Sequence, residues 1–180
     1  MRVITGSARG SKLITLEGNA TRPTREAVKE AVFSMIQFEL EGARVLDLFA
    51  GCGQMGIEAL SRGAASCVFT DRSNEAVKVI KENLTHTKLM SKARVSCCDY
   101  TAALRNATYD IAFVDPPYSE GYMEKILPAL APCVSDGGVI LCESDVHDPM
   151  PERLPRENGD FVVTKSKRYV RSVITVYRKE

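Results

Sequence analysis

The sequence lacks any long apolar run. No uninterrupted hydrophobic stretch approaches the roughly 20 residues that a membrane-spanning helix needs. The first residues, MRVITGSARGSKL, contain no apolar segment of the kind found in a secretory signal. These two absences argue against a membrane or secreted protein, and we expect the chain to act in the cytoplasm.

Residues that bind metals are scarce and scattered. The chain has two histidines and six cysteines, at positions 52, 67, 97, 98, 133 and 142, and no two cysteines form a C-x-x-C pair. A zinc site needs ligands clustered at short spacing. The sequence therefore predicts no metal site, and it predicts reduced, mostly buried thiols.

Internal repeats, low-complexity tracts and linkers are also missing from the 180 residues. Hydrophobic residues make up 44% of the chain and charged residues 26%, which is typical of a globular, soluble protein. A chain of this length can bury a sizeable core. We expect a single domain over residues 1–180 and a monomer.

The net charge is only +1, but it is unevenly distributed. Residues 1–30 have six basic and three acidic side chains, and residues 161–180 have six and one. The segment between them has twelve basic and nineteen acidic side chains. Basic ends around an acidic middle fit a polyanionic partner held by the termini. Solvated surface lysines and arginines explain the same pattern equally well.

Strand patterns alternate with helix patterns along the chain. Residues 2–18 are typical of a short hairpin or extended arm, and residues 160–179 of an antiparallel hairpin around a basic turn. Thr24 is positioned to cap the first helix, and Ser73 or Asn74 the third. Expected strands cover 44–51, 66–71, 93–99, 109–115 and 137–143, and expected helices cover 21–40, 56–63, 73–84 and 122–132, the last interrupted by Pro128.

This alternation predicts an α/β fold with a mostly parallel sheet, helices on both faces and an antiparallel edge formed by the last hairpin. In such folds the ligand lies beyond the carboxyl ends of the strands. The residues that follow each strand are therefore the candidates for function.

A glycine-rich segment follows the first strand. Gly51, Gly53 and Gly56 match G-x-G-x-x-G, and glycines there allow a tight turn close to a ligand. Asp71 ends the second strand, twenty positions after Gly51, where an acid can accept hydrogen bonds from both hydroxyls of a ribose. A turn that needs positive φ and an acid that caps a helix explain these residues separately, but together they predict an adenosine-bearing cofactor.

Asp47 bears on which cofactor that is. It lies four residues before Gly51, near the mouth of the expected pocket, where a dinucleotide would place its pyrophosphate. A carboxylate suits a ligand with a cationic end, and S-adenosylmethionine carries a sulfonium and an ammonium but no phosphate. We therefore expect S-adenosylmethionine. The alternative is a structural acid that binds loop amides.

Two further strand ends carry candidate residues. Asp99 follows the third strand and could accept from an adenine amino group, with Tyr100 packed on the ring. The fourth strand ends in Asp115, Pro116, Pro117 and Tyr118. The Asp115 carboxylate and the Pro116 carbonyl could accept from the exocyclic amine of a nucleobase, on which Tyr118 could stack. The prolines fix the backbone, so these acceptors need not reorganise during methyl transfer.

These motifs carry a family resemblance. VLDLFAGCGQMGIEALSRGA, DPPY and TRPTREAVKEAVFSMI together resemble the class I S-adenosylmethionine-dependent methyltransferases, and more narrowly the bacterial 16S ribosomal RNA guanine-N2 methyltransferases, the RsmD-like group. MRVITGSARGSKL is similar to the opening arm of that group. The resemblance covers residues 1–145 well and the last hairpin loosely. Cys52 and Met55 are bulkier than the small residues expected in the glycine loop.

The resemblance implies a Rossmann-like, seven-stranded sheet and methylation of the N2 amine of one guanine in 16S rRNA, within a largely assembled small ribosomal subunit. It implies catalysis by Asp115, Pro116, Pro117 and Tyr118. The implied cofactor contacts are Asp47, Phe49, Ala50, Gly51, Gly53, Asp71, Arg72, Asp99, Tyr100 and Thr24.

The expected RNA contacts lie in the arm and in the segment after it. Residues 1–20 form the arm, and the contacts are Arg2, Arg9, Lys12, Arg22 and Arg25. A second set in the last hairpin comprises Lys165, Lys167, Arg168 and Arg171. An amino-methyltransferase acting on DNA, on another RNA or on a small molecule is the alternative, and a non-catalytic nucleotide-binding module is a third possibility.

Overall fold

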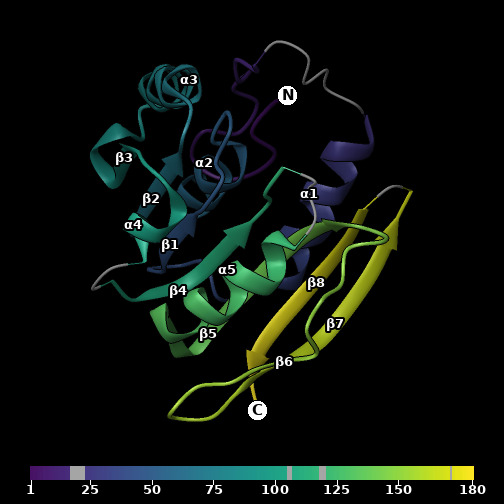
Figure 1. Cartoon of the computed structure of the whole chain (residues 1–180). Coiled ribbons are helices and arrows are strands. Elements are labelled where there is room, and N and C mark those ends of the chain that lie inside the picture. The colour runs from purple at the N-terminus through teal and green to yellow at the C-terminus, as the bar shows by residue number, and fades with distance from the viewer. Residues whose placement is uncertain (17–22, 105–106, 118–120, 171) are drawn as a thin grey trace.

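The computed structural model describes residues 1–16, 23–104, 107–117, 121–170 and 172–180, although the side chains of residues 23–25 fall outside the description. One sheet of eight strands runs through these residues in the order β3-β2-β1-β4-β5-β8-β7-β6 (Figure 1). Strands β1 to β5 pair in parallel, and β8, β7 and β6 continue the sheet in antiparallel pairs. The strands are β1 (Arg44–Asp47), β2 (Ser66–Asp71), β3 (Ala93–Cys97), β4 (Tyr109–Val114), β5 (Val134–Asp145), β6 (Arg153–Leu154), β7 (Phe161–Tyr169) and β8 (Ser172–Lys179).

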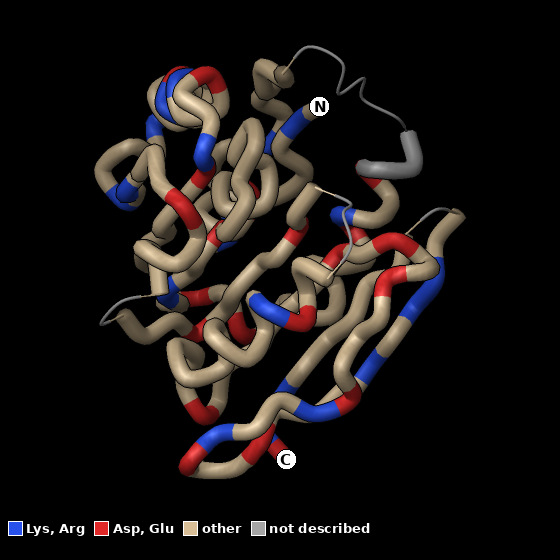
Figure 2. Tube along the Cα trace, in the orientation of Figure 1, with Lys and Arg blue, Asp and Glu red and all other residues tan. Residues whose placement is uncertain are grey.

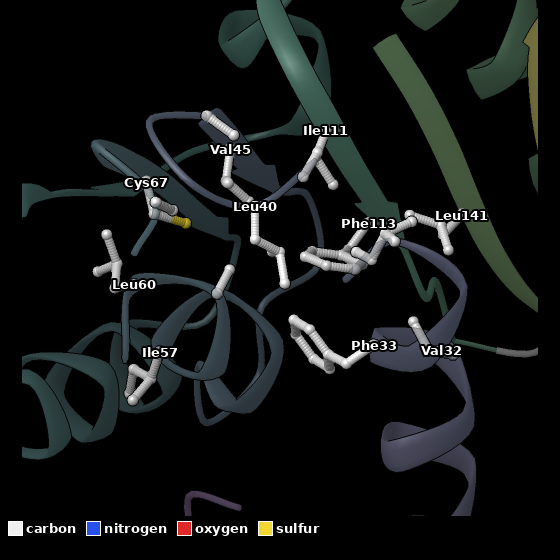
Figure 3. Close-up of a cluster of buried hydrophobic side chains, with 14 of the residues drawn as sticks. Val32, Phe33, Leu40, Val45, Ile57, Leu60, Cys67, Ile111, Phe113 and Leu141 are labelled. Carbon is white, nitrogen blue, oxygen red and sulfur yellow. The ribbon is translucent and has the colours of Figure 1, made fainter. Parts of the chain in front are cut away.

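Helices cover both faces of this sheet. One buried cluster joins α1, α2 and α3 to the sheet, and Figure 3 shows Phe33 of α1 beside Phe113 of β4. The second cluster packs α5, and more loosely α4, on the opposite face. The α-helices are α1 (Pro23–Met35), α2 (Gln54–Ser61), α3 (Asn74–His86), α4 (Tyr100–Ala103) and α5 (Tyr122–Leu130), with 3-10 turns at Met90–Lys92 and Ala131–Cys133.

The predicted α/β class is confirmed, with two differences in the sheet. The sheet has eight strands instead of seven, because the two-residue strand β6 pairs with the start of β7. The basic residues expected in the last turn, Lys165, Lys167 and Arg168, lie inside β7, where lysine and arginine are tolerated on an exposed edge.

The helix ends also differ from the prediction. Helix α1 begins at Pro23, so Thr24 lies inside it and is not its cap, since proline is favoured in the first turn of a helix. Helix α5 continues through Pro128 to Leu130, because its buried face holds the turn in place. Ser73 caps α3 as predicted, with its hydroxyl accepting a hydrogen bond from the Ala76 amide.

Residues 1–16 fold back on themselves as a loop, and the isolated antiparallel bridge described within them joins Arg2 and Lys12. Val3 and Leu13 are buried, so this arm is part of the domain and packs on its core. Across the described residues, no helix is long and apolar enough to cross a membrane.

Candidate active site

A cavity of about 590 Å³ opens at the carboxyl ends of the parallel strands. This volume is in the usual range for a small-molecule or cofactor site. Its wall brings together the segments that follow β1, β2, β3 and β4, as the strand order predicts. The predicted site residues in the wall are Phe49, Ala50, Gly51, Asp71, Arg72, Asp99, Tyr100, Asp115, Pro116 and Pro117.

The glycine loop uses its glycines for two different purposes. Gly51 has φ of 54°, and a Cβ built there would have no atom within 4 Å, so this backbone faces open space. Gly53 has φ of 78°, and its added Cβ would lie 3.3 Å from Ile80. Gly51 therefore leaves room for a ligand, whereas Gly53 allows the loop to turn onto α3.

Asp71 fixes this loop from the neighbouring strand. One carboxylate oxygen accepts from the Gly51 amide at 2.9 Å, and the other accepts from the Ser73 amide at 2.9 Å. Asp71 remains in the cavity wall, and each oxygen keeps a further lone pair. The carboxylate can therefore hold the loop and accept from a ligand hydroxyl as well.

Asp47 lies behind the wall. Its carboxyl group is almost completely buried and accepts from the Gly56 amide at 2.8 Å. Burial raises the pKa of Asp47 to about 7, against the opposing effect of the Gly56 hydrogen bond. Neither Asp47 nor Gly53 is among the described residues of the wall, and the observed contact of Asp47 is that of a structural acid, although the amide that it binds belongs to the first turn of α2 and not to the loop. Direct contact with a cationic ligand stays a prediction.

Gln54 is a wall residue that the sequence did not identify. Its side-chain oxygen is buried and has no hydrogen-bond partner among the described residues. A buried acceptor without a donor is costly, so a ligand donor at this place would be favourable. The ammonium group of S-adenosylmethionine is such a donor. Together with the open backbone at Gly51, this acceptor fits that cofactor.

Three aromatic rings stand on one side of the cavity. Phe49 lies 6.0 Å from Tyr100 and 6.3 Å from Tyr122, measured between ring centroids. Asp99 caps the short helix α4 by accepting from the Thr101 amide at 3.0 Å, which explains why Tyr100 is held at this position. Rings so placed can pack against an adenine. Tyr122 was not predicted, because it begins α5 beyond the DPPY motif.

The DPPY motif stands on the same cavity. Asp115 is exposed and Pro116 is buried, and both line the wall with Pro117. The fourth predicted residue of the motif, Tyr118, lies outside the described residues. The described part thus places a carboxylate at the cavity that the glycine loop also borders.

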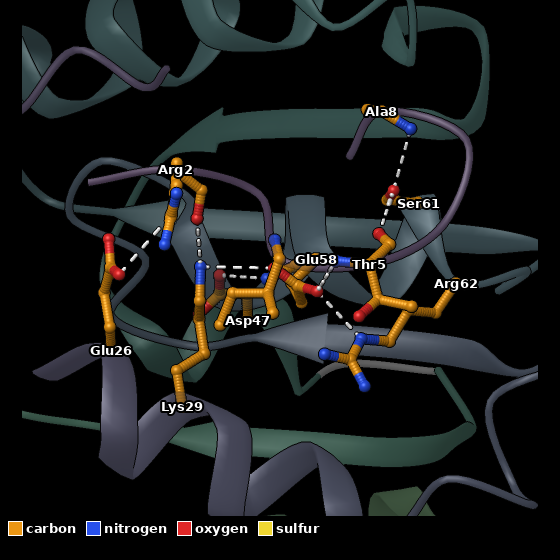
Figure 4. Close-up of polar contacts among 11 residues, drawn as sticks. Arg2, Thr5, Ala8, Glu26, Lys29, Asp47, Glu58, Ser61 and Arg62 are labelled. Atoms are coloured by element: carbon orange, nitrogen blue, oxygen red, sulfur yellow. Dashed lines mark hydrogen bonds and ion pairs between the residues drawn. The ribbon is translucent and has the colours of Figure 1, made fainter. Parts of the chain in front are cut away.

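A buried ion cluster holds the arm beside the cavity (Figure 4). The Glu58 carboxylate of α2 accepts from the amides of Ile4 and Thr5, at 2.8 and 3.0 Å. It also pairs with Lys29 at 3.2 Å and Arg62 at 2.8 Å. Burial lowers the pKa of Lys29, although Glu58 opposes that shift. This arrangement matters for the site because Met1, Thr15, Leu16 and Lys29 line the cavity.

Asn83 makes a second connection between the arm and the glycine loop. Its buried amide binds both backbone groups of Ile14, as acceptor at 2.8 Å and donor at 3.0 Å. The same side chain donates to the Cys52 carbonyl at 2.9 Å. One residue of α3 therefore sets the position of the arm and of the loop together.

The predicted RNA contacts are only partly described. Arg9 and Lys12 are exposed on the arm, and Arg2 forms an ion pair with Glu26 at 3.5 Å. Arg22 and the side chains of Thr24 and Arg25 lie outside the description. Their contacts with RNA or cofactor stay predictions.

The prediction of mostly buried thiols is only half right. Cys67, Cys133 and Cys142 are buried, whereas Cys52 and Cys98 are partly exposed and Cys97 is exposed, and all six are free. The exposed cysteine ends β3 at the sheet edge, where no further strand covers it in the described part of the chain.

Comparison with known proteins decides the family. A protein-family model described as "Conserved hypothetical protein 95" matches residues 1–178. The chain belongs to this family. The putative rRNA methyltransferase YlbH of Bacillus subtilis is 38% identical over 186 residues, which cover 99% of each protein. Ribosomal RNA small subunit methyltransferase D of Escherichia coli is 32% identical over 155 residues, 84% of this chain and 78% of that protein.

Solved structures agree with this family assignment. The putative methyltransferase yhhF from Escherichia coli has a TM-score of 0.85 at 29% identity, over 100% of this chain and 98% of that one. SMU.776, a putative methyltransferase complexed with SAH, has a TM-score of 0.67 over 87% of this chain and 50% of that one. At 15% identity the second likeness shows the fold alone. The predicted Rossmann-like methyltransferase class is confirmed.

Proposed function

We propose that this protein transfers a methyl group from S-adenosylmethionine to the exocyclic N2 amine of a guanine in 16S ribosomal RNA. The observation that carries the proposal is the shared cavity, whose wall contains both the Asp71–Gly51 pair and Asp115 with Pro116. A cofactor held by the first pair and an amine held by the second would meet in one enclosed space. The names of the relatives support ribosomal RNA as the substrate, and such a substrate would place the enzyme in the cytoplasm.

The cofactor half of the site is assigned residue by residue. Asp71 would accept from the ribose hydroxyls, and the unpartnered Gln54 oxygen would accept from the ammonium. Phe49 and Tyr100 would pack on the adenine, with the backbone of Gly51 leaving room for the ligand. When bound, the cofactor supplies an electrophilic methyl group on a sulfonium sulfur.

The amine half of the site has a different task. An exocyclic amine is a poor nucleophile, because its lone pair is delocalised into the ring. Asp115 and the Pro116 carbonyl would accept hydrogen bonds from the amine and stabilise the positive charge that develops on nitrogen. The rest of the rate enhancement would come from holding the two reactants in line. No covalent intermediate is required: the N–CH3 bond would form as the S–CH3 bond breaks, S-adenosylhomocysteine would be the leaving group, and the amine proton would then pass to water.

Replacing Asp115 with asparagine tests this proposal. The amide keeps the shape of the side chain but removes the charge and one acceptor. We expect the turnover number to fall on the order of 10²- to 10³-fold, because a preorganised acceptor is missing in the transition state. The affinity for S-adenosylhomocysteine, measured by calorimetry, should stay unchanged. Asp71→Ala should give the opposite result, with weaker cofactor binding.

A labelling experiment with the same enzyme identifies the substrate. Small ribosomal subunits from cells lacking this protein are incubated with the enzyme and labelled cofactor, and the RNA is digested to nucleosides for mass analysis. The expected product is N2-methylguanosine in 16S rRNA. Label in another nucleoside, or in added DNA, would replace the substrate assignment, and normal turnover by Asp115→Asn would remove the role of Asp115.

A further inference from the structure

The last hairpin, β7 with β8, places two lysines next to the cavity. In an antiparallel pair, residues directly opposite one another lie on the same face of the sheet. Lys167 lies opposite Ile174, and Lys165 lies opposite Val176. Ile174 lines the cavity, and both apolar partners belong to the buried cluster under α1. Lys165 and Lys167 therefore project on the α1 face, with Lys167 roughly 5 Å along the sheet from a wall residue.

Arg168 lies on the other face of the same strand. It pairs in register with Val173, one position along from the partner of Lys167. Side chains alternate across a strand, so Arg168 points toward the side of the sheet that α5 covers. The basic residues of β7 are thus divided between two faces, although Figure 2, which draws only the Cα trace, shows them as blue segments along one strand.

The cations of the hairpin also differ in their partners. At the end of the hairpin far from the cavity, acids neutralise the basic side chains, with Arg178 bound to Glu39 and Lys179 to Asp136. Arg153, at the neighbouring strand β6, binds Asp160 and Glu180. Within the described part of the chain, no ion pair neutralises Lys165, Lys167 or Arg168. The free positive charge of the hairpin is therefore concentrated at its cavity end.

Tyr169 gives this surface an aromatic element. The Lys167 ammonium lies 5.3 Å from the centroid of its ring, a distance that allows a cation–π contact. The Tyr169 hydroxyl is buried and has no hydrogen-bond partner among the residues described. The ring packs partly against the cluster under α1, so it holds Lys167 on the same face as the cavity wall.

We propose that Lys165 and Lys167 form a phosphate-binding track that guides the RNA strand flanking the target guanine into the cavity. This proposal rests on the proposed function and adds a surface in the last hairpin to the one expected in the arm. Unpaired lysines on an exposed face bind the phosphate backbone without reading sequence. The two lysines set the path of the strand and leave recognition of the target base to the cavity.

The alternative role of these charges is protection of the sheet edge. Among the described residues, β6 and the residue before it bond only to the first three residues of β7, and lysines on an exposed edge discourage pairing with another chain. That role does not depend on which face a charge occupies. Lys167→Gln and Arg168→Gln therefore distinguish the two roles, because each removes one charge from the same strand but from opposite faces.

The experiment measures binding of the full-length enzyme to small ribosomal subunits isolated from cells that lack it. The test variant is Lys165→Gln/Lys167→Gln, and the single variants Lys167→Gln and Arg168→Gln are measured beside it. Its matched control is Lys78→Gln/Lys81→Gln, which removes two exposed charges from α3 near the other edge of the sheet. Dissociation constants are measured over a range of salt concentrations, and the affinity for S-adenosylhomocysteine is measured beside them.

We expect the test variant to bind the particle on the order of tenfold more weakly at 0.1 M salt. The slope of its log affinity against log salt concentration should be shallower by about 0.7 for each phosphate that it no longer neutralises. Cofactor affinity should not change, and Lys78→Gln/Lys81→Gln and Arg168→Gln should resemble the wild type.

Two results would overturn the track. One is a drop in affinity for Arg168→Gln as large as that for Lys167→Gln, and the other is wild-type affinity of the test variant, with aggregation seen by light scattering as the only change. Wild-type enzyme that binds but does not methylate the particle would instead refute the proposed function, because the weaker binding of the test variant would still be measurable.

Discussion

Glu58→Gln is the substitution that most directly tests how the arm is held. The carboxylate accepts four hydrogen bonds or ion pairs, from the amides of Ile4 and Thr5 and from the side chains of Lys29 and Arg62. Glutamine has nearly the same shape, so the change leaves no cavity. It replaces one acceptor oxygen with a donor and removes the negative charge.

The structure sets the size of the effect. The side chains of Glu58 and Lys29 are 0% and 1% exposed, so the variant leaves an ammonium buried without its counter-charge. Breaking a buried pair in this way costs about 3–5 kcal/mol of the free energy of unfolding. The matched control is Glu26→Gln, which removes the ion pair with the exposed Arg2 and should cost no more than about 1 kcal/mol.

Urea unfolding followed by circular dichroism measures both decreases in stability, and amide hydrogen exchange locates them. We expect the amides of Ile4 and Thr5 to exchange faster in Glu58→Gln, because their acceptor has been weakened. A weaker affinity for S-adenosylhomocysteine should accompany this, since Met1, Thr15 and Leu16 of the arm region line the cavity. The reasoning is refuted if Glu58→Gln is no less stable than Glu26→Gln, or if the two amides stay as protected as in the wild type.

Two other predictions concern the glycine loop. Because the pKa of folded Asp47 is about 7 and that of an unfolded aspartate is about 3.9, the folded state binds the extra proton between these values and its stability falls as pH rises from about 4 to 7. Asp47→Asn should remove this fall, so that at pH 8 its free energy of unfolding exceeds that of the wild type by up to about 4 kcal/mol. Urea unfolding curves of both proteins at pH 4 and pH 8 check this difference. Gly56→Ala should destabilise the folded protein by about 1–3 kcal/mol, since the added Cβ would lie 2.3 Å from the Phe69 ring. Gly51→Ala should mainly weaken cofactor binding, because its Cβ would meet no protein atom. Thermal melts with and without S-adenosylhomocysteine separate the two effects.

The strands of the parallel sheet could be predicted because each is a short apolar run bounded by glycine or a polar residue. The expected strand 66–71 matches β2 residue for residue, and Ser73 caps α3 as expected. Because the carboxyl ends of parallel strands meet at one edge of the sheet, the predicted strand ends also placed Asp71 and Asp115 together. Both residues line the cavity in the structure.

The buried polar contacts could not be predicted in the same way. Lys29 and Asn83 would ordinarily be assigned to solvent, and partners distant in the sequence make their burial favourable: Glu58 for Lys29, and Ile14 of the arm for Asn83. A signal for Lys29 did exist, because it lies four residues before Phe33 and seven before Ile36, on the apolar stripe of the first helix. Gln54 carried no such signal, because its unpartnered oxygen depends on the shape of the loop.

The long-range docking of the arm has a consequence for synthesis of the chain. Ile4 and Ile14 are made early, but their partners Glu58 and Asn83 follow 54 and 69 residues later. The nascent arm therefore has no docking site until α2 and α3 have left the ribosome, and until then Val3 and Leu13 stay exposed to solvent or to chaperones. The arm is thus translated first but cannot dock beside the cavity before Asn83 has been made.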